Sequence, residues 1–292
     1  MFATLLGDLP RPPLEDGAPA EAILDGCLAL QNEHGLEPLT DGGWPIFPDE
    51  PARSWLATAE RADRLVKAVV TGPWTSGRPV ADLRRDLQAL AEAGCRWIEI
   101  QEPAVTTLAD PASADDADDL RQAFADAHRE LTAGFGPEIH LSLAIVGGAA
   151  DTVGIDTILA GGYASLALDL IDGPDNWRLA VAAPTGVGII CGTVAGRSGS
   201  DDSPEILLWA AGYAAQTSGR GPDRVGLATA GSLAGLAWED AATKVRRLGE
   251  AARIAMLPPE EQRAALDPRA FDLRTAALGH DAPARPPRRR PR

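Results

Sequence analysis

Short apolar or β-branched segments alternate along the chain with longer segments whose apolar residues recur at helical spacing. This alternation is typical of βαβ units, in which helices join parallel strands. The pattern predicts eight strands, at residues 2–6, 37–40, 65–72, 96–103, 138–146, 163–170, 186–191 and 224–229. It predicts helices near residues 20–34, 80–94, 115–133 and 238–255.

Eight such units in roughly 250 residues have the size and rhythm of a TIM barrel. The alternative, an open doubly wound sheet, needs a phosphate-binding loop after its first strand. The segment GDLPRPPLEDG, residues 7–17, has neither a GxGxxG motif nor a Walker lysine. We therefore predict an α/β fold, a single (β/α)8 TIM barrel over residues 1–257. Residues 258–292 are rich in Pro, Ala and Arg, which predicts a basic tail with one short helix near residues 259–266 and a disordered end.

The composition excludes several classes of protein. Hydrophobic residues make up 45% of the 292 residues and charged residues 24%, which is ordinary for a globular protein and not for a fibrous or disordered chain. Neither a long apolar run nor a signal peptide is present, so we expect no membrane association. The three widely spaced cysteines form neither a disulfide framework nor a metal knuckle, so we expect a cytoplasmic protein.

The charge distribution is uneven. The chain carries a net charge of −15, which disfavours binding to nucleic acid or to an anionic membrane. The last twelve residues, DAPARPPRRRPR, hold five Arg and one Asp, which leaves 22 basic and 41 acidic residues in the remainder. We expect a small-molecule substrate and a solvated tail, and we leave a partner protein or a homodimer open.

Catalytic groups of a barrel lie at the carboxyl ends of its strands. Polar residues at the predicted strand ends include Asp8, Asp41, Thr75, Gln101, Glu102, His140, Ser142, Asp169 and Thr193. Glu102 has no structural role visible in the sequence. Carboxylates that share one mouth would raise one another's pKa values and could supply a general acid or base. The alternative is that several of them cap helices.

Six phrases of the chain resemble, in order, the catalytic barrel of cobalamin-independent methionine synthase. They are ATLLGDLPRP, GLEPLTDGG, VVTGPWT, AGCRWIEIQEPAV, HLSL and LATAGSLAGLAWED. The resemblance extends from about Thr4 to Ala255 and covers only the catalytic barrel of the longer, two-barrel enzymes. It implies a barrel fold and the transfer of a methyl group from a folate to a zinc-bound homocysteine thiolate.

The chain departs from this family at the implied zinc site, which takes one His, two Cys and one Glu. His140 matches the histidine, but the cysteine positions fall on Ser142 and Gly231. Asp169 is the nearest counterpart of the glutamate. One or two ligands do not make a nitrogen and sulfur site, so we predict no tightly bound zinc, a relict His140 and no other tightly bound cofactor.

The implied amino-acid pocket departs as well. The two carboxylates that the family uses to hold an ammonium group fall on Gly43 and Gln101, and a proton-carrying histidine falls on Thr193. Asp8 replaces a small residue of the family's opening turn. The half of the site that faces the folate is retained as Asp41, Glu102 and the GPWT turn at residues 72–75, where Trp74 could stack on a pterin.

The sequence therefore predicts a zinc-independent methyltransferase that takes a one-carbon group from 5-methyltetrahydrofolate, as a co-substrate, to a small acceptor other than homocysteine. The catalytic candidates are Glu102, Asp41, Asp169 and His140. The binding candidates are Asp8, Trp74, Thr75, Gln101, Ser142 and Thr193.

A non-catalytic barrel that binds a ligand or partner is the main alternative. A uroporphyrinogen decarboxylase-like enzyme would need an arginine-rich N-terminal motif that is absent, and an orthodox methionine synthase would need stoichiometric zinc. Packing is expected to explain the tryptophans on helices, Trp177 and Trp209 among them.

Overall fold

The computed structural model describes residues 1–109, 117–200 and 202–266. The strands are β1 (Phe2–Thr4), β2 (Ala68–Thr71), β3 (Trp97–Gln101), β4 (His140–Ile145), β5 (Ser165–Asp169), β6 (Gly188–Val194) and β7 (Val225–Thr229). The helices of two turns or more are α1 (Ala20–Glu33), α2 (Pro51–Ala59), α4 (Val80–Glu92), α5 (Ala117–Thr132), α8 (Pro204–Gln216) and α9 (Trp238–Ala255). Shorter helices are α3 (Pro73–Ser76), α6 (Ile155–Ile158), α7 (Trp177–Ala182) and α10 (Pro259–Ala265).

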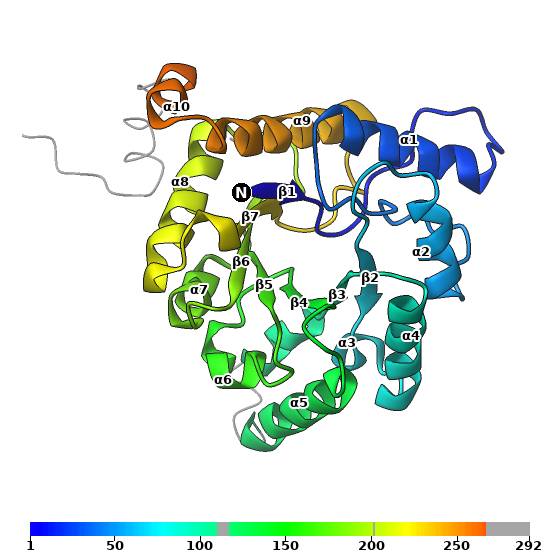
Figure 1. The fold of residues 1–292 in the computed structure, drawn as a ribbon, viewed down its shortest axis with the longest axis vertical. Helices are drawn as coiled ribbons and strands as arrows, with labels where there is room; N and C mark the ends of the chain where they lie inside the picture. Colours follow the sequence, from blue (N-terminus) through cyan, green and yellow to red (C-terminus); the bar gives the residue numbers. More distant parts are fainter. Residues whose placement is uncertain (110–116, 201, 267–292) are drawn as a thin grey trace, which may run out of the picture.

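The seven strands form one parallel sheet in the order β1-β7-β6-β5-β4-β3-β2. Figure 1 shows that the sheet curls around a centre and that the helices lie outside it. All the strands run in the same direction, so their carboxyl ends share one edge of the curled sheet. The structure confirms the α/β class and the parallel pairing that the alternation predicts.

The full eight-stranded barrel is not confirmed, because the expected strand at residues 37–40 does not form. Leu39 makes only an isolated bridge to Val66, although the Glu37 amide still donates to the Ala3 carbonyl at 2.8 Å. Pro38 lies in the middle of this segment and has no N–H to donate to a ladder. The segment therefore lies between β1 and β2, the two edges of the sheet, without completing a strand.

The two faces of the curled sheet carry different side chains. The outer face supplies large aliphatic residues such as Ile98, Leu143 and Leu166 to the main core, which the helices cover. The inner face carries a smaller cluster of Leu6, Ala144, Ala167, Ile190 and Ala228. Small residues suit the inner face because curling brings its side chains together. This period-two pattern leaves room inside the sheet for the polar residues described below.

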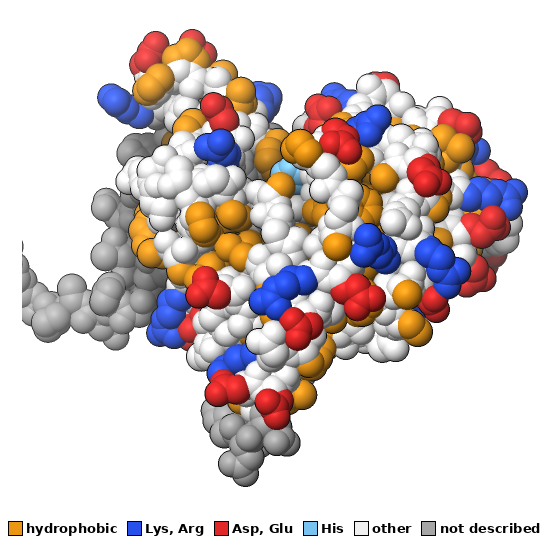
Figure 2. Space-filling model, turned by 60° about the horizontal axis from the view of Figure 1, so that its bottom comes forward, with side chains coloured by type: hydrophobic (Ala, Val, Ile, Leu, Met, Phe, Trp, Pro, Cys, Tyr) orange, Lys and Arg blue, Asp and Glu red, His pale blue; other side chains and the backbone are white. Residues whose placement is uncertain are grey.

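The surface mixes both signs of charge. Figure 2 shows acidic and basic side chains interspersed over the visible face, with hydrophobic side chains gathered between them. No helix within the described part of the chain combines the length and the apolar character needed to cross a membrane. The expected disordered end of the tail lies outside the described residues, and α10 occupies the position of the short helix predicted near residues 259–266.

Candidate functional site

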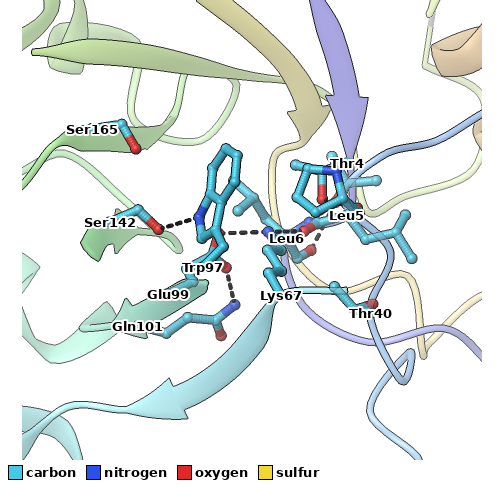
Figure 3. A network of polar contacts seen from close by, with 12 residues as sticks. Thr4, Leu5, Leu6, Thr40, Lys67, Trp97, Glu99, Gln101, Ser142 and Ser165 are labelled. Carbon is cyan, nitrogen blue, oxygen red and sulfur yellow. Dashed lines mark hydrogen bonds and ion pairs between the residues drawn. The ribbon is translucent and has the colours of Figure 1, made fainter. Parts of the chain in front are cut away.

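A buried ion pair lies on the inner face of the sheet. Lys67 Nζ is 2.5 Å from Glu99 Oε2 and donates to the Leu5 carbonyl oxygen at 2.8 Å (Figure 3). Both charged side chains are fully buried. The Gln101 side-chain amide donates to Glu99 Oε1 at 3.0 Å, so both carboxylate oxygens are occupied. Burial lowers the pKa of Lys67, while the charge of Glu99 acts in the opposite direction.

This pair connects the two edges of the sheet. Lys67 immediately precedes β2 and Leu5 immediately follows β1, so the lysine spans the place where the eighth strand is missing. Thr4 adds a second link by donating to the Pro38 carbonyl oxygen at 2.7 Å. Our sequence reasoning did not assign Lys67 and Glu99 to the site. Their signal was a charged residue between apolar neighbours in a strand, which places the charge on the face opposite the core.

His140 and Ser142 do not lie at the carboxyl ends of the strands, where the sequence analysis put them. His140 is the first residue of β4, and its partner in the sheet is Trp97, the first residue of β3. Its Nε2 is 2.9 Å from Ser165 Oγ, while Ser142 accepts a hydrogen bond from Trp97 Nε1 at 3.0 Å. These residues form a cluster at the amino end of the sheet. Burial lowers the pKa of His140 to about 4, and the charge of Lys67 adds to this effect.

The residues that the resemblance assigns to zinc do not fit that metal. His140 and Ser142 are bonded to other side chains, Gly231 has no ligand atom, and Asp169 lies at the other end of β5 from Ser165. Within residues 1–109, 117–200 and 202–266, no three His, Cys, Asp or Glu side chains gather closely enough to hold a metal ion. We therefore derive no catalytic step through zinc.

Glu102 directly follows β3 and is fully buried. Its Oε1 accepts from the Trp74 amide at 2.9 Å, and its Oε2 accepts from the Thr75 amide at 2.8 Å and the Thr75 hydroxyl at 2.6 Å. A Cβ on Gly72 would lie 2.2 Å from Glu102 Oε1, so only glycine allows this approach. The carboxylate thus holds the GPWT turn, which forms α3.

His128 and Tyr163 complete the surroundings of Glu102, and sequence reasoning missed both. His128 Nε2 lies 3.2 Å from Glu102 Oε1, and Nδ1 of the same ring contacts the Tyr163 hydroxyl. A carboxylate accepts hydrogen bonds, which assigns the proton to Nε2 and makes Nδ1 the acceptor of the Tyr163 hydroxyl. Burial raises the pKa of Tyr163, and Glu102 adds to this effect, so the phenol keeps its proton. Nothing in the sequence pattern linked these residues, because they lie 26 and 61 positions after Glu102.

The remaining predicted residues at the carboxyl edge differ in their burial and in their contacts with the rest of the protein. Trp74 is partly buried and packs edge-on against Phe124, with ring centroids 5.9 Å apart. Asp169 is buried and accepts hydrogen bonds from the amides of Gly147, Ile171 and Asp172, so it organises two loops. Thr193 is buried and donates to the Cys191 carbonyl oxygen at 3.4 Å.

Asp8 and Asp41 are the two predicted carboxylates whose oxygens accept the fewest hydrogen bonds from the protein. Asp41 Oδ1 accepts from the Gly43 amide at 2.9 Å, and the backbone amide of Asp41 is a second, local donor to the carboxylate. Burial raises the pKa of Asp41; the Gly43 amide lowers it, and the charge of Asp8 raises it further. Burial also raises the pKa of Asp8. Both carboxyls are therefore easier to protonate than ordinary aspartates.

Asp8 occupies the space in front of Gly43. A Cβ on Gly43 would lie 2.3 Å from Asp8 Oδ1, and Gly43 has a φ of +82°, which also favours glycine. An acidic side chain at position 8 therefore excludes any side chain at position 43. The carboxylate that the resemblance implies at position 43 is absent, and Asp8 brings another carboxylate to the same place.

A cavity of about 130 Å³ lies beside Asp41, between α2 and β2. Its lining includes Asp41, Phe47, Trp55 and the segment Val66–Val69. Part of its lining comes from β2, an edge strand of the sheet. Val69 is 40% exposed within this strand. The volume corresponds to roughly four water molecules, so the cavity suits a small ligand group.

No protein-family model and no curated protein matches the chain. Its fold is similar to that of a B12-independent methionine synthase from Shewanella sp. W3-18-1 solved with selenomethionine, with a TM-score of 0.72, 12% identity, and coverage of 90% of this chain and 99% of that one. A "putative vitamin-B12 independent methionine synthase" from Listeria monocytogenes gives a TM-score of 0.69 and 14% identity, over 88% of this chain and 98% of that one. A "putative deoxyribose-phosphate aldolase" from Toxoplasma gondii ME49 gives 0.52 and 15%, over 85% and 91%. These likenesses show a TIM-barrel-like fold, which proteins described by different activities share.

Proposed function

We propose that this protein is a methyltransferase-like enzyme that moves a one-carbon group, with 5-methyltetrahydrofolate as the donor, to a small acceptor other than homocysteine. In this proposal the curled sheet acts as a TIM barrel distantly related to that of methionine synthase, and no tightly bound zinc takes part. The observation that carries the proposal is the Asp8 and Asp41 pair at the carboxyl edge, beside a cavity sized for a small group.

The pair of carboxyls suits the proton balance of this reaction. The N5–CH₃ bond of the donor breaks while a bond forms between that methyl group and the acceptor. The acceptor loses one proton, and N5 of the departing tetrahydrofolate gains one. A raised pKa makes an ionised carboxyl a stronger base and makes a carboxyl easier to protonate, so Asp41 would take the acceptor proton and Asp8 would supply the other.

The other predicted residues take supporting roles. Glu102 positions Trp74 and Thr75 through the GPWT turn, and the exposed face of Trp74 would stack on the pterin. Gln101 donates one amide hydrogen to Glu99, which directs its carbonyl oxygen away from that carboxylate and makes it an acceptor for the substrate. Asp169 and Thr193 would shape the opposite side of the mouth. His140 and Ser142, at the amino end, would not contact the substrate.

The direct test is a calorimetric titration of the protein with 5-methyltetrahydrofolate. We expect saturable heat that is lost in Trp74→Ala and kept in Trp238→Ala, the same change at a partly buried tryptophan on α9. Asp41→Asn should still bind the donor but should not transfer an isotopically labelled methyl group in an acceptor screen. Absence of heat at high ligand concentration would remove folate as the donor.

A non-catalytic binding barrel is the second candidate, and one observation favours it. Glu102 and Asp169, two of the predicted catalytic acids, have their oxygens occupied by protein hydrogen bonds. This candidate predicts that a ligand binds at the mouth with equal affinity in Asp41→Asn and wild-type protein and is recovered unchanged. Turnover of the labelled donor that depends on Asp41 would exclude it.

A further inference from the structure

An aromatic face lies on the outside of α7 and α8. We use this name for Trp177, Val181, Trp209 and Tyr213. Trp209 and Tyr213 are four residues apart on α8 and stack with centroids 5.7 Å apart and planes 14° apart. Trp177 on α7 packs edge-on against both, at 6.2 and 5.0 Å. Three of the nine Trp and Tyr residues of the chain therefore gather here.

Side chains of the aromatic face are close to half exposed to solvent. Trp209 is 47% exposed, Tyr213 42% and Val181 46%. An added Cβ at Gly212, between the two α8 aromatics in sequence, would have no heavy atom within 4 Å. Packing against Trp177 and Tyr213 therefore covers only about half of the Trp209 side chain. Clustered apolar residues of this size on an outer helix typically mark a contact site.

We propose that residues 281–292 of the same chain, DAPARPPRRRPR, bind to this aromatic face. The proposal does not depend on the proposed enzymatic function. Proline-rich segments adopt an extended polyproline conformation that docks on exposed aromatic side chains without much loss of entropy. Arginine guanidinium groups are planar and stack on Trp and Tyr rings. The segment holds four Pro and five Arg, so both kinds of contact are available.

Charge and reach support the same occupant. The remainder of the chain has 22 basic and 41 acidic residues, so the basic segment is attracted to the body that carries the face. The last described helix, α10, packs on α9, and α9 packs on α8 (Figure 1). Twenty-six residues follow Leu266. In an extended polyproline conformation they span up to about 80 Å, which exceeds the distance across a domain of this size.

The experiment places a fluorophore on the segment and uses the tryptophans as contact quenchers. Ala284→Cys in the full-length protein provides the attachment point, because the three native cysteines are buried. With an oxazine dye, which tryptophan quenches on contact, we expect quenched emission. Changing the five arginines of the segment to Gln should restore it, because the dye is unchanged and only the stacking cations are lost.

Two substitutions at the exposed Val181 keep every tryptophan in place. Val181→Lys places a like charge beside the arginines and should weaken docking about two- to fivefold for each stacked guanidinium displaced. Val181→Asp should preserve the quenching. Leu56→Ala, at another exposed apolar residue on α2, should have no effect.

Three results would overturn the proposal. The first is quenching that is equal in wild type and Val181→Lys, with circular dichroism showing that the variant is folded. The second is quenching that survives the loss of all five arginines, which would mean that the dye itself binds. The third is quenching that increases with protein concentration, which would assign the aromatic face to a second copy of the chain.

Discussion

Glu102 and Asp41 are both acids at the carboxyl edge of the curled sheet, yet their surroundings differ. Four donors surround the fully buried carboxylate of Glu102: two amides, one hydroxyl and one imidazole. Among the described residues, Asp41 has only local backbone donors, the amides of Gly43 and of Asp41 itself, and it borders a cavity. A position at the carboxyl edge of a barrel is therefore not sufficient evidence of catalysis. The number of unoccupied lone pairs separates an acid that holds the fold from one that can meet a substrate.

The largest expected effect separates these two acids by stability. Glu102→Ala should lower the free energy of unfolding by about 4 kcal/mol, because it leaves buried donors without an acceptor. Asp41→Ala should cost less than about 1 kcal/mol. Urea unfolding followed by circular dichroism measures both. Similar losses in the two variants would show that Asp41 also holds the fold.

The sequence predicted the features that depend on local hydrophobic periodicity. It did not predict the contacts that form only when the sheet curls and brings distant segments together. Alternating segments located the parallel strands, and the end of β3 located Glu102. The contacts of Glu102 with His128 and Tyr163 join three separate elements, and no spacing rule links them. The absence of a strand at residues 37–40 was not predicted, because the apolar pattern was given more weight than Pro38. Likewise, the exclusion between Asp8 and Gly43 becomes visible only when two loops are brought together.

Glu99 is a third acid for this comparison, and its carboxylate forms a buried ion pair with Lys67. Lys67→Met should destabilise the protein by about 3 kcal/mol, because it leaves Glu99 buried without its counter-charge. Adding Glu99→Gln should recover about 1–2 kcal/mol by removing that charge. The same urea titration measures the cycle. If the double variant were less stable than Lys67→Met, the Glu99 carboxylate would stabilise the fold through the Gln101 amide even without the charge of Lys67.

The Asp8 side of the mouth can be tested through the glycine that it requires. Gly43→Ala should cost about 2 kcal/mol, partly from the positive φ and partly from the clash with the Asp8 carboxylate. In an Asp8→Gly background the same change should cost only about 1 kcal/mol, because the Asp8 Cβ, which also lies 2.5 Å from the added Cβ, is removed and the backbone strain alone remains. Gly77→Ala is a control with positive φ and no neighbour within 4 Å. Equal costs in both backgrounds would mean that Asp8 does not occupy this space.

The smallest expected effect comes from the pKa shift of His140. The direction of that shift shows whether His140 lies at the amino end of the sheet or at the mouth. At a solvated mouth lined with carboxylates, the pKa of a histidine would rise. At the observed position, burial and Lys67 lower the pKa of His140 to about 4. The folded protein should therefore keep this imidazole neutral while the unfolded chain binds a proton near pH 6.5. Stability contributed at neutral pH should be lost as the pH falls from 6.5 to about 4.

His140→Gln should flatten this part of the stability profile, and NMR titration of the His140 ring should give a midpoint below 6.5. A midpoint above 6.5 would instead place His140 with Asp8 and Asp41, where the sequence analysis had put it.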